Sequence, residues 1–342
     1  AKVKPPAATG KQYYTNLPKD HDYLAEFKRD VLDFYDCFTV GGGPRMEPEV
    51  ALSYVREGKD KVLDMMINFA HMEADCFITD FLQRPFDLVK LKKAFTKWQT
   101  KMYGKGWNAL YMENHDHPRI ISRYGSEKYR VESGKSIAAS YLFQRGTPFV
   151  YQGQEIGMIN TPLPSLDDYK DIMVKNNARI ARSLGLSKET VLRLAQKASR
   201  DNARTCMQWT GAPNAGFTNG KPWFVVNSNY KDINVESQLD DPGSILNFYR
   251  NALQFRRDNP VVIYGDYVEH MPKSKELYVY ERNLAGKKLL VICSYSEKCV
   301  RFDAPEGITL DETKQVFGNY DNNFVISNGF TTRPYEMRVY LF

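Results

Sequence analysis

The side chains best suited to chemistry form one unbroken polar run at 113–117 (ENHDH), directly after the apolar segment 109–112. An apolar segment of this length suffices for one buried strand, and Pro118 prevents a hydrogen-bonded ladder from continuing beyond the run. In α/β barrels, the side chains at the C-terminal ends of the strands form the active site. The run therefore predicts either an active-site edge or a polar loop that contains one buried His–Asp hydrogen bond.

Metal binding is the first chemistry that these residue types suggest. Two sets of side chains could supply ligands: His115, Asp116 and His117, or His71, Glu73 and Asp75. Neighbouring residues on an extended chain point in opposite directions, so at most two members of either set could reach one metal ion. We therefore expect these residues to form hydrogen bonds at the edge of a sheet, with no metal site and no cofactor.

Two other chemistries lack their usual motifs. Residues 41–43 (GGG) follow an apolar segment, but neither GxGxxG nor GK[ST] occurs at this point, so a phosphate-binding loop is only weakly indicated. A Ser–His–Asp triad has no GxSxG nucleophile elbow to support it.

Short apolar segments alternate with helical patterns along the first half of the chain. The segments expected to form strands are 37–40, 62–69, 109–112 and 147–151. The helical patterns lie at 21–36, 49–57, 86–103 and 134–144. Glycine and proline at 41–44 are expected to end the first strand. This alternation predicts a parallel sheet with helices outside, whose strand ends meet at one rim.

The helix expected at 86–103 has two distinct faces. Its apolar face carries Leu88, Leu91, Phe95, Trp98 and Met102. The other face is rich in lysine, and we expect it to be a solvated surface made by Lys90, Lys92, Lys93, Lys97 and Lys101.

The pattern of expected helices and strands changes twice in the second half of the chain. Residues 157–238 are irregular, with one clear helix at 188–198, and a further amphipathic helix is expected at 244–257. Short alternating strands then follow, and 283–286 (NLAG) between two apolar runs is typical of a β-hairpin. The sequence therefore predicts a first domain over 1–258, with an irregular insertion at about 157–238, and a small antiparallel β domain over 259–342.

Composition excludes several classes of protein. The net charge is +6 over 342 residues and the basic residues are dispersed, so no nucleic-acid partner is expected. No apolar run reaches transmembrane length, and the first residues lack the apolar core of a signal peptide, so no membrane partner is expected. The five cysteines are widely spaced without CxxC, which favours a reduced, cytoplasmic location over a disulfide framework.

Three longer motifs resemble the blocks of one family. The segment 113–125 (ENHDHPRIISRYG) resembles NHDQPR-x-x-SR-F/Y-G, with histidine where glutamine is usual. Further matches follow in family order at 146–158 (GTPFVYQGQEIGM), 199–209 (SRDNARTCMQW), 215–218, 222–227 and 233–238. Over essentially its whole length, the chain resembles the α-glucosidase, oligo-1,6-glucosidase and sucrose isomerase branch of the α-amylase family (glycoside hydrolase family 13).

The resemblance implies an α/β fold, a (β/α)8 TIM barrel followed by a C-terminal β-sandwich. Residues 1–258 would be the C-terminal half of the barrel, with strands five to eight, and 259–342 the sandwich. The family's strand-four block, which carries the aspartate nucleophile, would lie before Ala1. We therefore expect another chain or an unrecorded segment to supply the N-terminal half of the barrel. Because open strand edges are left bare, we expect residues 1–342 not to fold stably alone.

The resemblance also implies a retaining mechanism, in which one carboxylate attacks the anomeric carbon and a second acts as acid and then base. Asp116 falls on the position of a third carboxylate, which stabilises the oxocarbenium-like transition state. Substrate binding is implied for His115, Arg204, Phe69 and Arg119. Of these, His115 would bond a hydroxyl of the cleaved sugar, with Arg204 at the same subsite and Phe69 near the leaving group. Core packing of Phe69 and an ion pair of Arg204 are the alternative interpretations.

Two departures from the family pattern each remove a carboxylate. The strand-five block TVGE is replaced by 39–42 (TVGG), so Gly42 occupies the position of the acid/base glutamate. The block FEH is replaced by 69–71 (FAH), with Ala70 in place of glutamate. Glu47 and Glu49 are close in sequence to Gly42, but we expect them in the following loop and helix.

Three functions remain open. The leading hypothesis is a retaining hydrolase of α-glucosidic bonds in short oligosaccharides of the maltose or isomaltose type, inactive as this chain alone. A sucrose isomerase or transglucosidase of the same family is the second. A catalytically inactive sugar-binding or scaffolding homologue is the third, and Gly42 favours it.

Overall fold

A computed structural model describes residues 13, 16–77, 81–321 and 325–342, so the first twelve residues of the predicted barrel segment lie outside the described residues. The α-helices are α1 Pro18–Asp30, α2 Pro48–Val55, α3 Leu88–Met102, α4 Ile120–Tyr124, α5 Arg130–Leu142, α6 Ile172–Ser183, α7 Lys188–Ala198, α8 Glu236–Leu239, α9 Ile245–Asp258 and α10 Pro260–Tyr264. The strands are β1 Val40–Gly43, β2 Met65–Asn68, β3 Ala109–Leu110, β4 Thr147–Pro148, β5 Val268–His270, β6 Leu277–Leu284, β7 Lys287–Ser294, β8 Val300–Asp303, β9 Gln315–Gly318, β10 Gly329–Thr332 and β11 Met337–Leu341.

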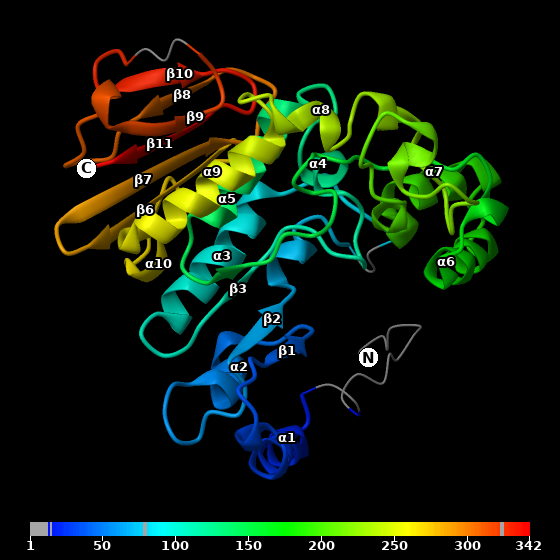
Figure 1. The fold of residues 1–342 in the computed structure, drawn as a ribbon, viewed down its shortest axis with the longest axis horizontal. Helices are drawn as coiled ribbons and strands as arrows, with labels where there is room; N and C mark the ends of the chain where they lie inside the picture. The colour runs from blue at the N-terminus through cyan, green and yellow to red at the C-terminus, as the bar shows by residue number, and fades with distance from the viewer. Residues whose placement is uncertain (1–12, 14–15, 78–80, 322–324) are drawn as a thin grey trace, which may run out of the picture.

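Four parallel strands organise the first half of the chain. β1 pairs with β2 and β3 pairs with β4, both in parallel, and a parallel bridge between Met66 and Asn108 joins the two pairs. The strands therefore lie side by side in chain order with their C-terminal ends pointing the same way. β1 and β2 are seen next to each other in Figure 1. The predicted parallel pairing is confirmed, although β2, β3 and β4 are shorter than their apolar segments and β1 is shifted toward the C-terminus of its segment.

The glycines that were expected to end the first strand belong to it. The strand begins at Val40 and runs through the three glycines, whereas Phe38 of the expected strand is 62% exposed. A Cβ at Gly41 would collide with the Met66 side chain and lie 2.7 Å from that of Leu63. Because these atoms are the ends of flexible side chains, a larger residue would displace them, and glycine at Gly41 favours the close packing of β2 against β1 from within the strand.

Helix α5 is enclosed between the parallel strands and the C-terminal sheet. Ser136 and Ser140 on it are fully buried and form hydrogen bonds to Ser294 and Tyr295 of the C-terminal domain. One continuous core joins α3, α5 and α9 with strands β6, β7 and β11. A helix that is buried on all sides needs no solvated face, which accounts for its mixture of alanine and serine.

The C-terminal domain is antiparallel, as predicted. Its larger sheet has the order β5-β6-β7-β11-β9, and β8 pairs with β10 in a second sheet. Ala285 and Gly286 between β6 and β7 both have positive φ, which matches the predicted hairpin. A separate core lies between the two sheets and includes Leu277, Val279, Leu290, Ile292, Phe302 and Phe330. The range 259–342 also contains the short helix α10, which the strand pattern did not predict.

Lys92 corrects the prediction that the lysine-rich face of α3 is solvated. Its side chain is fully buried, and Nζ donates hydrogen bonds to the carbonyls of Met271, Ser274 and Leu277 at 2.7, 2.9 and 3.2 Å. Glu269 lies 3.9 Å from the same ammonium group. The C-terminal domain covers this turn of the helix, and the three hydrogen bonds of Lys92 hold that domain against α3.

We expect Lys92→Met to lower the free energy of unfolding by about 2–4 kcal/mol, because three buried carbonyls lose their donor and Glu269 loses its nearby cation. Urea unfolding, followed through tryptophan fluorescence in a longer protein that contains this chain and completes the sheet, measures the effect. Lys93→Met on the exposed face of the same helix is the matched control and should change stability by less than about 0.5 kcal/mol. Equal stability of the two variants would show that Lys92 does not hold the C-terminal domain against α3.

The helix α1 and the segment that joins it to β1 expose many large apolar side chains. We call this surface the N-terminal apolar face; its members are between 48% and 75% exposed and are Tyr23, Phe27, Phe34, Tyr35 and Phe38. The helix expected at 21–36 breaks here, because α1 ends at Asp30 and a 3-10 turn spans 32–34. Clusters of this kind normally face a partner surface.

The irregular segment 157–238 contains a helix that sequence analysis missed. α6 packs against the predicted α7, and the shared cluster includes Val174, Ala178, Ala181, Val191, Ala195 and Ala198. The spacing of the first three is helical, and Asp171 caps the helix by accepting from the N–H of Met173 at 2.9 Å. Together α6 and α7 form a lobe beside the C-terminal ends of the parallel strands (Figure 1).

Candidate active site

The loop after β3 is held in shape by its own side chains. Asn114 Oδ1 accepts a hydrogen bond from the backbone N–H of Asp116 at 2.8 Å, which forms a local turn. Glu113 Oε2 accepts from the N–H of Ile120 at 3.0 Å, and its Oε1 accepts from Arg119 Nη1 at 2.6 Å. These bonds anchor both ends of the loop in the core and leave the Asp116 side chain 43% exposed.

Two arginines and a histidine contact the carboxylate of Asp116. Its Oδ1 accepts hydrogen bonds from Arg204 Nη2 at 2.9 Å and Arg200 Nη1 at 3.3 Å. His115 Nε2 lies 3.4 Å from Oδ2, and the His115 carbonyl accepts from Arg204 Nε at 2.9 Å. Three of the predicted site residues therefore meet at one point, although they come from segments almost ninety residues apart in the chain.

Arg200 connects this point to the α6–α7 lobe. It donates to Asp171 Oδ1 from Nη2 at 2.6 Å and from Nε at 3.0 Å. Burial would raise the pKa of Asp171, but hydrogen bonds from Arg200 and from the N–H of Met173 outweigh it and hold that pKa below its usual value. Arg200 thus forms ion pairs with both Asp171 and Asp116, and so it links the α6–α7 lobe to the loop after β3.

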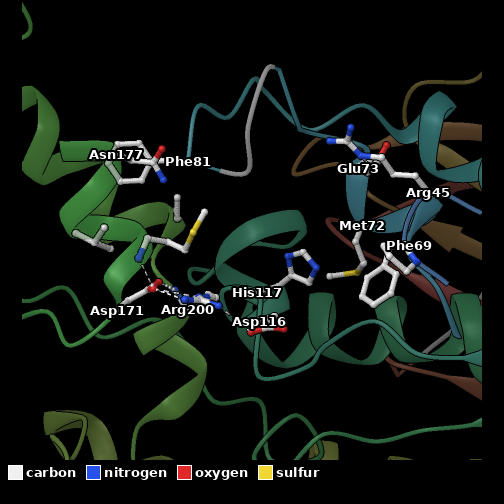
Figure 2. Close-up of a pocket in the computed structure, with 14 residues that line it drawn as sticks. Arg45, Phe69, Met72, Glu73, Phe81, Asp116, His117, Asp171, Asn177 and Arg200 are labelled. Carbon is white, nitrogen blue, oxygen red and sulfur yellow. Dashed lines mark hydrogen bonds and ion pairs between the residues drawn. The ribbon is translucent and has the colours of Figure 1, made fainter. Parts of the chain in front are cut away.

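A pocket of about 380 Å³ lies between the lobe and the strand ends. Figure 2 shows Asp116, His117 and Arg200 on its floor, with Phe69 and Arg45 at one end and Asp171 and Asn177 at the other. The residues that line it are Pro44, Arg45, Phe69, Met72, Glu73, Phe81, Asp116, His117, Asp171, Met173, Val174, Asn177, Ala198 and Arg200. Apolar side chains and a few charged groups share the lining, as is common in ligand sites.

Phe69 lies in the lining and rests on a layer of buried rings. Its ring centroid is 6.1 Å from that of Tyr111 and 6.5 Å from that of His117. Below, His71 stacks on Phe95 with a centroid distance of 5.2 Å. Burial, with a smaller effect from His117, lowers the pKa of His71 to about 3, so this imidazole stays neutral at ordinary pH. His71 is therefore part of the support for the pocket and not a cationic group within it.

Arg119 lies beneath the pocket and not on its surface. Its side chain is fully buried, and Nη1 donates to Glu113 and to the carbonyl of Gln152 at 2.7 Å. This corrects the expectation of a substrate contact, because no part of Arg119 reaches the lining. Its bonds join the loops after β3 and β4, so it positions the loop that carries Asp116. Burial also raises the pKa of nearby Glu155, a carboxyl that is likewise absent from the lining.

Gly42 is exposed on β1, just before the lining residues Pro44 and Arg45. A Cβ built on Gly42 meets no atom within 4 Å, in contrast to the crowded Gly41. Its φ lies outside the positive range that disfavours other residues. The backbone thus places no requirement for glycine at Gly42, and a larger side chain has room there.

Several lining residues were not predicted from the sequence. Arg200 precedes the predicted Arg204 within the same motif, and its position one helical turn earlier was a usable signal. Asp171, Met173 and Asn177 belong to the missed helix α6 and its cap, and the helical spacing of Val174, Ala178 and Ala181 was the signal that could have found them. In the part of the chain that the structure describes, no three His, Cys, Asp or Glu side chains converge as a metal site. Each helix in this part is too short or too polar to cross a membrane.

Comparison with known proteins shows which family the chain belongs to. The family model for the α-amylase catalytic domain matches residues 2–265. The chain belongs to the α-amylase family. It is 40% identical over 337 residues to an oligo-1,6-glucosidase of Parageobacillus thermoglucosidasius, which covers 97% of this chain and 60% of that protein. It is 35% identical over 335 residues to a trehalose-6-phosphate hydrolase of Bacillus subtilis, with 97% and 60% covered.

Solved structures of the α-amylase family agree with the fold. The crystal structure of Bacillus licheniformis trehalose-6-phosphate hydrolase superimposes with a TM-score of 0.91 at 38% identity, covering 98% of this chain and 61% of that one. The isomaltulose synthase SmuA of Protaminobacter rubrum gives 0.88 at 32% identity, covering 95% and 59%. The chain thus shares the α/β barrel fold class of the α-amylase family, with an antiparallel β domain at its C-terminus. It spans about 60% of the length of the relatives that it matches.

Proposed function

We propose that this chain supplies strands five to eight of a (β/α)8 barrel, over residues 1–258, followed by a β-sandwich over 259–342. The four parallel strands in chain order support this assignment, because they cover one arc and do not close on themselves. The N-terminal apolar face beside β1 supports it as well, because a second set of strands and helices would cover it. Another chain or a further segment would complete the barrel, and we call the product the completed barrel.

We further propose that the completed barrel acts on α-glucosides with retention of configuration. The observation that carries this proposal is Asp116, a carboxylate that follows β3 and lines the pocket together with Arg200, while Arg204 and His115 contact it from outside the lining. Its negative charge would stabilise positive charge that develops at the anomeric carbon. Phe69 would contact the sugar at one end of the pocket. The attacking carboxylate would come from the complementary half of the barrel.

Gly42 limits this chemistry. Glycine has no proton to give, and the three pocket-lining carboxylates, Glu73, Asp116 and Asp171, each form an ion pair with an arginine. Hydrolysis of a disaccharide needs a protonated leaving group, so we propose weak activity on short maltose- or isomaltose-type substrates. A sugar-binding homologue without catalysis is the second candidate, and the open space at Gly42 favours it. Isomerisation is a third, because isomaltulose synthases share the fold at about 30% identity.

The test is turnover of 4-nitrophenyl α-glucoside, whose leaving group needs no proton. We expect the completed barrel to release nitrophenol and to form α-glucose first, as seen by NMR before mutarotation. Residues 1–342 alone should show no turnover. If the completed barrel binds glucose but releases no nitrophenol, the sugar-binding candidate replaces the hydrolase. If β-glucose forms first, the retaining mechanism is wrong.

A further inference from the structure

One edge of the pocket has lost negative charge. Gly42 and Ala70 stand where the family pattern has glutamates, in TVGE and FEH respectively. They lie on or directly after the adjacent strands β1 and β2, which pair in parallel. Relative to the pattern, two carboxylates are therefore missing from neighbouring positions. An anionic ligand would meet less repulsion here than in a protein that follows the family pattern, with Glu73 as the carboxylate that still lines this edge.

A cationic side chain occupies the same edge. Arg45 follows β1 and lines the pocket together with Asp116, and its side chain is 58% exposed. Its φ is 54°, and the turn is closed by a 3.3 Å hydrogen bond from the N–H of Met46 to the carbonyl of Gly43. This local geometry holds Arg45 at the pocket mouth and does not let it follow the strand.

The present partner of Arg45 leaves capacity for a ligand. Its Nε lies 3.6 Å from Glu73 Oε1, longer than a charge-assisted hydrogen bond, and Glu73 is itself half exposed. Arg200, by contrast, is bonded to both Asp171 and Asp116. Arginine recognises phosphate through paired N–H donors. Arg45 is thus the guanidinium of this lining that is best placed to receive an anionic group.

The absence of a general acid at Gly42 restricts which leaving groups the site can release. A sugar must receive a proton as its bond to the anomeric carbon breaks, and Gly42 cannot supply one. A phosphate monoester carries an ionisable proton of its own near neutral pH. On the basis of the proposed function, we propose that the substrate is an α-glucosyl phosphate, with its glucose unit beside Asp116 and its phosphate on Arg45.

The step balances without a protein acid. The carboxylate of the complementary half attacks C1 of the glucosyl phosphate monoanion, and the C1–O bond breaks. Its electron pair leaves with the phosphate, which already carries the proton and departs as HPO₄²⁻. In reverse, HPO₄²⁻ attacks C1 of the glucosyl-enzyme, and the electron pair of the C1–O bond returns to the carboxylate. Neither direction requires a group at Gly42, so the site would exchange glucose between the carboxylate and phosphate.

The experiment measures exchange of radiolabelled inorganic phosphate into α-glucose 1-phosphate by the completed barrel. We expect exchange with retention, and little hydrolysis of maltose under the same conditions. Arg45→Gln should raise KM for glucose 1-phosphate by about tenfold or more, because a charge-assisted hydrogen bond to phosphate is lost. KM for 4-nitrophenyl α-glucoside should rise much less, because its leaving group does not carry the charge of a phosphate. Arg56→Gln, an exposed arginine outside the lining, is the matched charge control and should change neither value.

Three results would overturn the inference. Turnover of the aryl glucoside without phosphate exchange would leave the proposed function intact and remove the phosphate substrate. Equal KM values for wild type and Arg45→Gln would remove Arg45 as the phosphate contact. Ready maltose hydrolysis that Glu73→Gln abolishes would show that Glu73 replaces the missing acid. Failure of every substrate, aryl glucoside included, would instead contradict the proposed function itself.

Discussion

Gly42→Glu in the completed barrel is expected to raise the hydrolysis rate of maltose or isomaltose by about 10²–10⁴-fold, the usual value of positioned general acid–base catalysis. The structure makes this gain accessible, because a Cβ at Gly42 meets no atom within 4 Å and the backbone has an ordinary φ. The new carboxyl would protonate the departing sugar and then deprotonate the attacking water. Steady-state kinetics on the disaccharide, compared between the two proteins, measure the gain.

Gly42→Gln is the matched control for this gain. It fills the same space and offers hydrogen bonds, but it has no proton to transfer. We expect it to leave disaccharide hydrolysis near the level of the glycine protein. The glycosylation rate with 4-nitrophenyl α-glucoside should change little in either variant, because nitrophenolate leaves without a proton. If Gly42→Glu and wild type hydrolyse the disaccharide equally, another group already supplies the proton and the assignment of Gly42 fails.

The sequence could predict those elements whose signal is local. The helix α7 begins and ends where its pattern placed it, and α3 and α9 differ by one or two residues from their apolar periodicity. The hairpin of β6 and β7 followed from a turn that requires positive φ. Parallel pairing followed from the alternation of strands and helices. Each of these features depends on residues that are close together in the chain.

Features that depend on distant packing were missed. Lys92 looks like its solvated neighbour Lys93, and only the carbonyls of the C-terminal domain, about 180 residues later, show why it is buried. Gly41 looks like a strand terminator, but it lies within β1, where the side chains of Met66 and Leu63 pack closely against it. A lysine or glycine reports its own propensity and not the surface that will cover it.

The site residues also divide into those that the sequence predicted correctly and those whose position only the structure shows. The resemblance placed His115, Asp116 and Arg204, and these three contact one another in the structure. Arg119 belongs to the same motif, but the motif does not distinguish a pocket contact from a buried support, and the structure makes it a support. Arg45 carried no motif at all, and its place at the pocket mouth depends on a turn with positive φ. Side-chain direction therefore had to come from the three-dimensional structure.

Asp116→Asn is expected to lower kcat of the completed barrel on 4-nitrophenyl α-glucoside by about 10²–10³-fold, the usual effect of losing one preorganised electrostatic group. Asparagine keeps the size of the side chain and an oxygen that can accept from Arg204 and Arg200. The change therefore removes negative charge and little else. Arg204 then loses its carboxylate partner beside the carbon where positive charge would develop, which disfavours the transition state further, whereas Arg200 keeps its ion pair with Asp171.

The ground state should be affected much less, because bound glucose carries no charge. We expect the dissociation constant for glucose, measured by calorimetry, to change by less than about threefold, so the loss appears in kcat and not in KM. Asp167→Asn, which removes a charge from the partly exposed 3-10 turn at 166–168 outside the lining, is the matched control and should retain full activity. A variant Asp116→Asn with near-normal kcat would show that the carboxylate only orders Arg200 and Arg204. The transition state would then be stabilised by groups from the complementary half of the barrel.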